Sequence, residues 1–185
     1  NFAHGDIIMV GGYAAFYAMV SGGLSPILSV LIAMVICTVL GLLIERIAYK
    51  PLRSAPSLAV LITAIGVSYF LQNLALLLFG ANTKTFQSVV TFGGISLAGG
   101  QLQLTGTTIV TIAACIIIVV GLSLYINKTR TGQAMLAVSE DRGAAQLMGI
   151  NVNSTIAMTF AIGSALAAIA GCLLCSAYPS LNPYT

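Results

Sequence analysis

The residue types that most often carry out chemistry are few and scattered in this 185-residue chain. Its four cysteines are Cys37, Cys115, Cys172 and Cys175, and the last two have the CxxC spacing found in some metal and redox sites. Each lies in an apolar stretch, and the CxxC pair has no histidine or acidic residue close by in the sequence. We therefore expect the cysteines to pack as small hydrophobic side chains rather than to bind metal or form disulfides.

Catalytic motifs are missing from the sequence as well. The single histidine is His4, and the chain contains no phosphate-binding glycine loop, no HExxH and no set of serine, histidine and aspartate in a recognisable order. We predict that the chain is not an enzyme, has no catalytic residues and binds no metal or cofactor. If nucleotide energy drives its function, a different subunit must bind the nucleotide.

Polar side chains do occur within one long apolar run, residues 57–79. On a helix, Thr63 and Asn73 would share one side, whereas Ser68 and Gln72 would lie on nearly the opposite side. Two polar stripes predict two contacts with protein or water, made either by hydrogen bonds to neighbouring helices or by a substrate path.

Ionisable side chains are expected only at the ends of the apolar runs. His4, Asp6, Glu45 and Arg46 all lie at such ends. Ion-coupled pumps commonly carry ionisable groups within their spans, so this distribution argues against an ion-coupled transporter or channel.

The elements that must position these residues are membrane spans. The chain is 58% hydrophobic and 6% charged, with a mean hydropathy of +1.04, which is typical of an integral membrane protein. A spanning helix needs roughly 20 apolar residues. We predict an all-α, polytopic helical bundle with five spans, at about residues 7–22, 26–44, 57–79, 107–126 and 155–178.

Six of the seven cations fall in two of the connecting segments, residues 45–56 and 127–154. Two spans separate these segments, so both lie on one side, which the positive-inside rule identifies as the cytoplasm. Lys84 would then lie outside, in the segment 80–106. A membrane topology accounts for this charge, and no basic tract predicts nucleic-acid binding. Because Asn1 is not a start methionine and Thr185 ends no polar tail, we interpret residues 1–185 as an internal fragment of a single transmembrane domain.

Two segments leave alternatives open. The first span is short and contains Gly11 and Gly12, so it could be tilted, extended by Phe2 and Ala3, or broken at depth, as in transporters. Residues 80–106 alternate apolar and polar side chains around glycines, which predicts short strands or a hairpin capping the outer face. That cap is either a plain connector or a docking surface for an extracytoplasmic partner.

The last apolar run repeats small residues every four positions, a pattern that lets helix backbones approach closely. From it we expect helix packing through Gly163, Ala167 and Gly171.

A contrasting polar stretch, residues 128–153, contains a short predicted helix with Ser139 as its N-cap and Gly149 as its C′ residue. A helix this short is stable only when packed, so docking to a soluble partner and packing as a membrane-surface connector are the two interpretations.

Several motifs along nearly the whole chain resemble the permease subunits of branched-chain amino-acid ABC importers. They are Asn1 to Gly5 with Gly11, Gly12 and Tyr13; Glu45-Arg46 with Tyr49 to Arg53; LITAIGVSYFLQN at 61–73; Arg130 with Gly132, Asp141, Ala144-Ala145 and Leu147 to Ile150; Thr159-Phe160; and Asn182 to Tyr184. Residues 80–106 resemble the family least. The resemblance implies further spans before Asn1 and after Thr185.

The resemblance also implies a function: a multi-pass subunit of a prokaryotic inner membrane that moves branched-chain amino acids by alternating access. Its implied partners are membrane lipid, a second homologous permease, two cytoplasmic ATPases that bind ATP-Mg, and an extracytoplasmic amino-acid-binding protein. Residues 139–149 would be the coupling helix, which contacts the ATPase through Ser139, Glu140, Asp141, Arg142, Leu147 and Gly149. The residues expected along the translocation pathway are His4, Tyr13, Thr63, Ser68, Gln72 and Asn73. The alternative function is a related permease for urea, amides or other amino acids.

Overall fold

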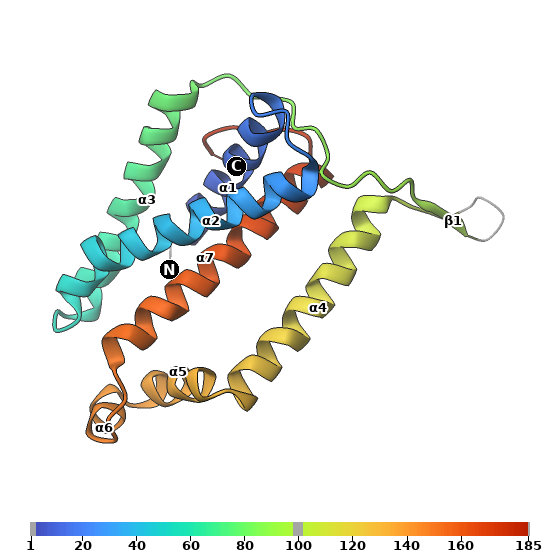
Figure 1. Cartoon of the computed structure of the whole chain (residues 1–185). Helices are drawn as coiled ribbons and strands as arrows, with labels where there is room; N and C mark the ends of the chain where they lie inside the picture. Colours follow the sequence, from blue (N-terminus) through green and yellow to red (C-terminus); the bar gives the residue numbers. More distant parts are fainter. Residues whose placement is uncertain (1–2, 98–101, 185) are drawn as a thin grey trace. The chain divides into compact units, whose positions relative to one another are not determined.

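The computed structural model describes residues 3–97 and 102–184 and consists mainly of helices (Figure 1). The chain divides into two compact units, residues 1–92 with 160–185 and residues 93–159. Within these described residues, four helical segments are long and apolar enough to cross a membrane: Pro26–Leu52, Ser57–Phe79, Gly106–Lys128 and Val152–Ala177. These segments confirm the all-α membrane class predicted from the sequence.

In the described residues, the first unit contains three complete α-helices and most of a fourth. They are α1 (His4–Val20), α2 (Pro26–Ile44), α3 (Ser57–Phe79) and the part of α7 (Val152–Ala177) from residue 160 onward. Proline occupies the first position of α2, where its missing N–H costs nothing, and Gly80 ends α3 with a φ of 80°. Both ends follow from residue types visible in the sequence.

The helix α2 continues without a break into a π-helix, Glu45–Tyr49, and a 3₁₀ turn, Lys50–Leu52. Glu45 is buried there and forms an ion pair with Arg53. This ion pair joins two residues of the connection between α2 and α3, so the charged segment is held by an internal contact and is not a loose surface loop.

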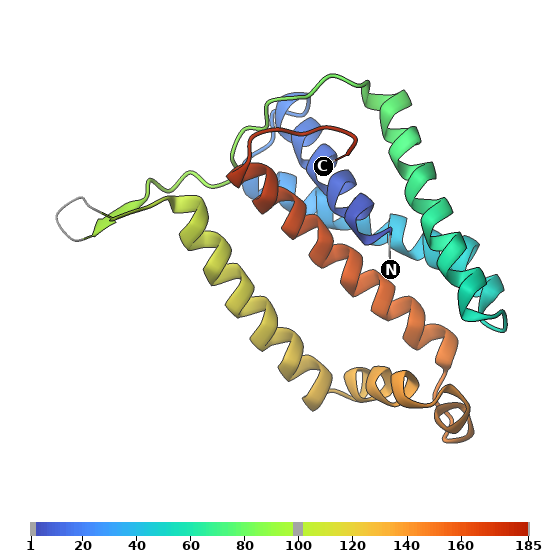
Figure 2. The same ribbon diagram turned by 180° about the vertical axis from the view of Figure 1, so that it is seen from behind.

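The helix α1 lies at the centre of the first unit, with α2, α3 and α7 around it (Figures 1 and 2). It is continuous through Gly11 and Gly12, so the predicted alternative of a broken first span is wrong. These glycines instead let α7 approach closely: a Cβ added at Gly11 would lie 2.7 Å from Cα of Ala168, and one at Gly12 would lie 3.0 Å from Sγ of Cys175. α1 has 17 residues and is not among the four candidate spans.

The predicted strand pattern at residues 85–92 is wrong, because no strand forms there. The backbone of this segment bonds to the last turn of α7 and to the chain that follows it, where N–H of Phe86 donates to O of Pro179 at 3.4 Å. Lys84 and Leu181 form an isolated antiparallel bridge, and N–H of Val89 donates to Oγ of Ser176 at 3.1 Å. Long-range partners of this kind leave no local signal in the sequence.

The second unit contains a hairpin and three helices. They are β1 (Ile95–Leu97) paired antiparallel with β2 (Leu102–Leu104), then α4 (Gly106–Lys128), α5 (Arg130–Glu140) and α6 (Arg142–Leu147). The hydroxyl of Thr129 accepts from N–H of Gly132 at 3.0 Å and thereby caps α5. The described part of the hairpin agrees with the strands expected in the second half of 80–106.

Candidate functional site

A polar contact joins α1 to α3 in the middle of the first unit. Nε2 of Gln72 donates to Oδ1 of Asp6 at 3.0 Å and lies 3.2 Å from Oγ of Ser68, one turn earlier on α3. Asp6 is only 6% exposed, whereas Gln72 and Ser68 are half-buried. The carboxylate is therefore held by a side chain of another helix within the protein.

An aromatic contact between α1 and α3 lies seven residues after the Asp6–Gln72 contact on each helix. The rings of Tyr13 and Phe79 stack with centroids 4.3 Å apart. Because Tyr13 follows Asp6 by seven residues and Phe79 follows Gln72 by seven, the two pairs are two helical turns apart on each helix. We call this line of contacts, formed by Asp6, Ser68 and Gln72 with Tyr13 and Phe79, the α1–α3 seam.

Asp6 lies in the first turn of α1, as expected for the end of this helix, but the seam places it away from both ends of α3. Its partner Gln72 comes 15 residues after the start of α3 and seven before the end. At 1.5 Å per residue, the contact lies about 22 Å from one end of this helix and about 10 Å from the other. Because α3 is itself a candidate span, the carboxylate of Asp6 lies alongside the interior of an apolar helix.

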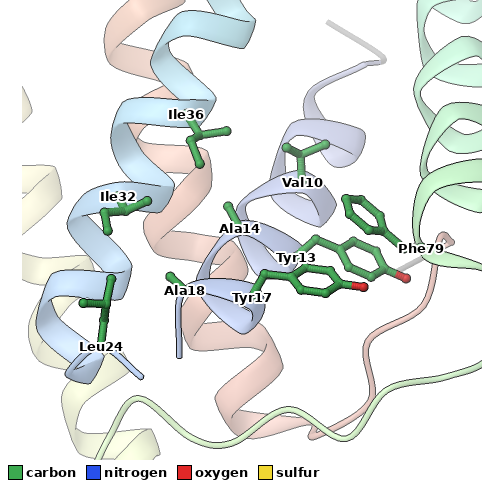
Figure 3. A pocket seen from close by; sticks show the side chains of 9 residues that line it. All are labelled: Val10, Tyr13, Ala14, Tyr17, Ala18, Leu24, Ile32, Ile36 and Phe79. Carbon is green, nitrogen blue, oxygen red and sulfur yellow. The ribbon is translucent and has the colours of Figure 1, made fainter. Parts of the chain in front are cut away.

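Beside the aromatic end of the seam is an apolar hollow of about 430 Å³ (Figure 3). It is lined by Val10, Tyr13, Ala14, Tyr17, Ala18, Leu24, Ile32, Ile36 and Phe79. These residues come from α1, α2 and the connection between them, together with the last residue of α3. The hydroxyl of Tyr13 is buried and has no hydrogen-bond partner in the part of the chain that the structure describes. The hollow can therefore accommodate an aliphatic group but offers no charge of its own.

The other predicted pathway residues are not brought to the seam by any hydrogen bond. His4 is exposed in the first turn of α1, and Thr63 is half-buried on α3. Asn73 is exposed and donates to O of Tyr69 on its own helix at 2.7 Å. The six candidates are thus spread along two helices, and the seam contains three of them: Tyr13, Ser68 and Gln72.

The predicted coupling segment is built differently from the expected single helix with Ser139 as its cap. Ser139 and Glu140 form the last turn of α5, and Asp141 caps the separate helix α6. Oδ1 of Asp141 accepts from N–H of Gly143 at 2.7 Å and from N–H of Ala144 at 3.0 Å. The assignment of the cap to Ser139 was wrong because Ser and Asp are both good caps and only two positions separate them.

The end of α6 has the predicted glycine geometry. Gly149 has a φ of 81°; its N–H donates to O of Gln146 at 3.0 Å, and N–H of Ile150 donates to O of Ala145 at 3.0 Å. This pair of bonds is a Schellman motif, which favours glycine at the left-handed position.

Most of the residues expected to contact an ATPase lie at the surface of this segment. Arg142 is exposed at the start of α6, and the apolar side chains of Leu147 and Met148 are 90% and 82% exposed. An apolar surface of this kind on a capped polar segment is available for a protein contact.

The predicted packing residues of α7 lie in different environments. Ala167 and Gly171 are buried, and a Cβ at Gly171 would meet the carbonyl oxygen of Ile8 on α1. A Cβ at Gly163, in contrast, would meet nothing within 4 Å, so close packing does not extend to that residue. The contact follows Ser164, Ala168 and Cys172 as well, because a four-residue repeat drifts around the helix.

Sequence reasoning missed Asp6 as a site residue. A signal was present, since Asp6, Val10 and Tyr13 are spaced i, i+4 and i+7 and share one face of a helix. The sequence does not show that the partner of Asp6 is Gln72, 66 residues away.

Among residues 3–97 and 102–184, no three histidine, cysteine, aspartate or glutamate side chains come together to hold a metal ion.

The comparisons with known proteins cover nearly all of the chain. A family model described as branched-chain amino acid transport system / permease component matches residues 1–184. Similar proteins include the high-affinity branched-chain amino acid transport system permease protein BraD of Pseudomonas aeruginosa, 37% identical over 99% of this chain, and the protein of the same description, LivH, of Escherichia coli K12, 38% identical over 100% of this chain. A probable branched-chain amino acid transport permease protein LivH of Methanocaldococcus jannaschii is 30% identical over 94% of this chain.

The chain spans 63% of the length of both bacterial relatives and 56% of the archaeal one. No solved structure matches it. The family model and the similar proteins point to the same class of membrane protein. The chain belongs to the family of permease components of branched-chain amino acid transport systems.

Proposed function

We propose that this chain is part of the membrane subunit of an ATP-driven importer that carries branched-chain amino acids across the inner membrane of a prokaryote. The observation that carries the proposal is the match of residues 1–184 to the permease family. In this assignment the chain crosses the membrane next to a second, similar permease. Two cytoplasmic ATPases supply the energy by hydrolysing ATP-Mg, and an extracytoplasmic binding protein delivers the amino acid.

The coupling contact is assigned to α6 and the residues at its two ends. Leu147 and Met148 provide an exposed apolar surface, and Asp141 and Gly149 fix the start and end of the helix. An isolated helix of this length is marginal in water, so these caps preserve a shape that the sequence alone would not hold. Docking into a cleft of an ATPase would bury the apolar side chains.

The connection from α6 to α7 supports a mechanical role. Ile150 is tied back to Ala145, and Asn151 caps α7 through its Oδ1, which accepts from N–H of Ser154 at 3.1 Å. The few residues between the two helices thus have their backbone conformation fixed by hydrogen bonds. A displacement of α6 by an ATPase would therefore be passed to α7 rather than absorbed by a flexible linker.

A photocrosslinking experiment tests this assignment. In the complete importer, Leu147 is replaced by the photoreactive residue p-benzoylphenylalanine, with Thr83 in the predicted outer segment as the matched control. We expect light to produce an adduct between position 147 and the ATPase, identified by mass spectrometry, and none from position 83. An ATPase adduct at both positions or at neither would refute the assignment.

The substrate class is tested separately by transport. The importer, reconstituted in proteoliposomes with its binding protein, should accumulate radiolabelled leucine only when ATP is enclosed on the ATPase side. Transport of urea or short amides instead of leucine would favour the alternative permease function.

A further inference from the structure

The carboxylate of Asp6 is buried, and the proposed function assigns it no role. The seam places it about 10 Å along α3 from the nearer helix end. A charged group within the interior of a membrane protein is costly unless it is paired or reaches water, and such groups commonly mark substrate or ion pathways. Asp6 therefore needs a partner that explains its charge.

That partner is not found among the described side chains. The hydrogen bond to Asp6 comes from the neutral amide of Gln72, and the one ion pair in residues 3–97 and 102–184 joins Glu45 to Arg53. A neutral amide orients a carboxylate but does not neutralise it. Among the described residues, the site thus has an acceptor for a cation and no cation paired with it.

The apolar hollow begins one helical turn from Asp6 along α1, although Asp6 itself does not line it. One helical turn beyond Asp6 on the same face of α1 is Val10, the first of the residues that line the apolar hollow. Four residues correspond to about 6 Å along the helix. A zwitterion could thus bring an ammonium group to Asp6 while its aliphatic side chain lies toward the hollow beside Tyr13 and Phe79 (Figure 3).

We propose that the Asp6 carboxylate, oriented by Gln72, receives the α-ammonium group of the amino acid as it passes along the α1–α3 seam. An ammonium group has three N–H donors and a compact charge, which a carboxylate binds with charge-assisted hydrogen bonds. Asp6 is then a substrate-contacting residue and Gln72 a positioning residue. This inference rests on the proposed function, because it requires an amino acid as the cargo.

The decisive variant is Asp6→Asn, which keeps the size of the side chain and a hydrogen bond to Gln72 but removes the charge. In the reconstituted importer we expect leucine uptake to fall at least tenfold, while ATP hydrolysis stimulated by the binding protein stays within about twofold of the wild type. Asp6→Glu should restore part of the uptake. Ser29→Ala, which alters another buried polar side chain with a bond inside its own helix, is the matched control and should transport normally.

Wild-type uptake by Asp6→Asn would overturn the proposal, as would an equal loss of uptake and of stimulated ATP hydrolysis. If Asp6→Asn does not assemble, a measurement on the unmodified importer decides. Dicyclohexylcarbodiimide should label Asp6, and leucine delivered by its binding protein during turnover should lower the labelling, as read by mass spectrometry; unchanged labelling would overturn the proposal. An unmodified importer that carries no leucine at all would instead refute the proposed function.

Discussion

The close contact between α1 and α7 makes a strong prediction for Gly11→Ala. A Cβ at this position would lie 2.7 Å from Cα of Ala168 and 3.3 Å from its Cβ, whereas ordinary contacts begin near 3.4 Å. The obstacle is backbone, which cannot rotate away, so the two helices must separate by about 0.7 Å. Overpacking of this kind typically costs about 1–3 kcal/mol.

A matched variant isolates this steric effect. Gly163→Ala also replaces a helical glycine, but its Cβ would meet nothing within 4 Å. Both variants gain up to about 1 kcal/mol from the higher helix propensity of alanine. We therefore expect Gly163→Ala to be neutral or slightly stabilising, and Gly11→Ala to have a free energy of unfolding about 1–3 kcal/mol lower than that of Gly163→Ala.

The assay is reversible unfolding of the purified full-length subunit by titration with sodium dodecyl sulfate in mixed micelles, followed by circular dichroism. Equal midpoints and slopes for the two variants would refute the close-contact reasoning. A lower midpoint for Gly163→Ala than for Gly11→Ala would show that the small-residue packing follows the simple four-residue repeat instead of the observed face.

Two further predictions concern the ends of α6. Asp141→Ala removes the acceptor for N–H of Gly143 and Ala144 and should destabilise the helix start by about 1 kcal/mol, seen as roughly fivefold faster hydrogen exchange at these amides, whereas Asp141→Asn should retain most of the protection. Gly149→Val forces a β-branched residue to a φ of 81° and should lower leucine transported per ATP hydrolysed; a normal ratio in proteoliposomes would contradict the role assigned to this cap.

The features that could be predicted from the sequence are those with local causes. Apolar runs gave α2, α3, α4 and α7 to within a few residues, and Gly149 marked the end of α6 through the demand of a left-handed position. These properties depend on residues near each other in the chain.

The features that could not be predicted depend on distant partners. Asp6 was expected at a span end because it directly precedes the charge-free run 7–22, and only its contact with Gln72 reveals how far along α3 it lies. The alternation in residues 85–92 was typical of a strand, but N–H of Val89 donates to the hydroxyl of Ser176 in the last turn of α7. Neither partner has a pattern in the sequence that would identify it.

The bridge between Lys84 and Leu181 gives α7 a second role beyond packing. Its backbone bonds, 2.8 and 2.9 Å long, tie the segment after α3 to the chain that leaves α7. The opposite end of α7 begins at the Asn151 cap that follows α6. Within the first unit, α7 therefore also anchors the segment that follows α3, because the chain leaving α7 holds Lys84 through these two backbone hydrogen bonds.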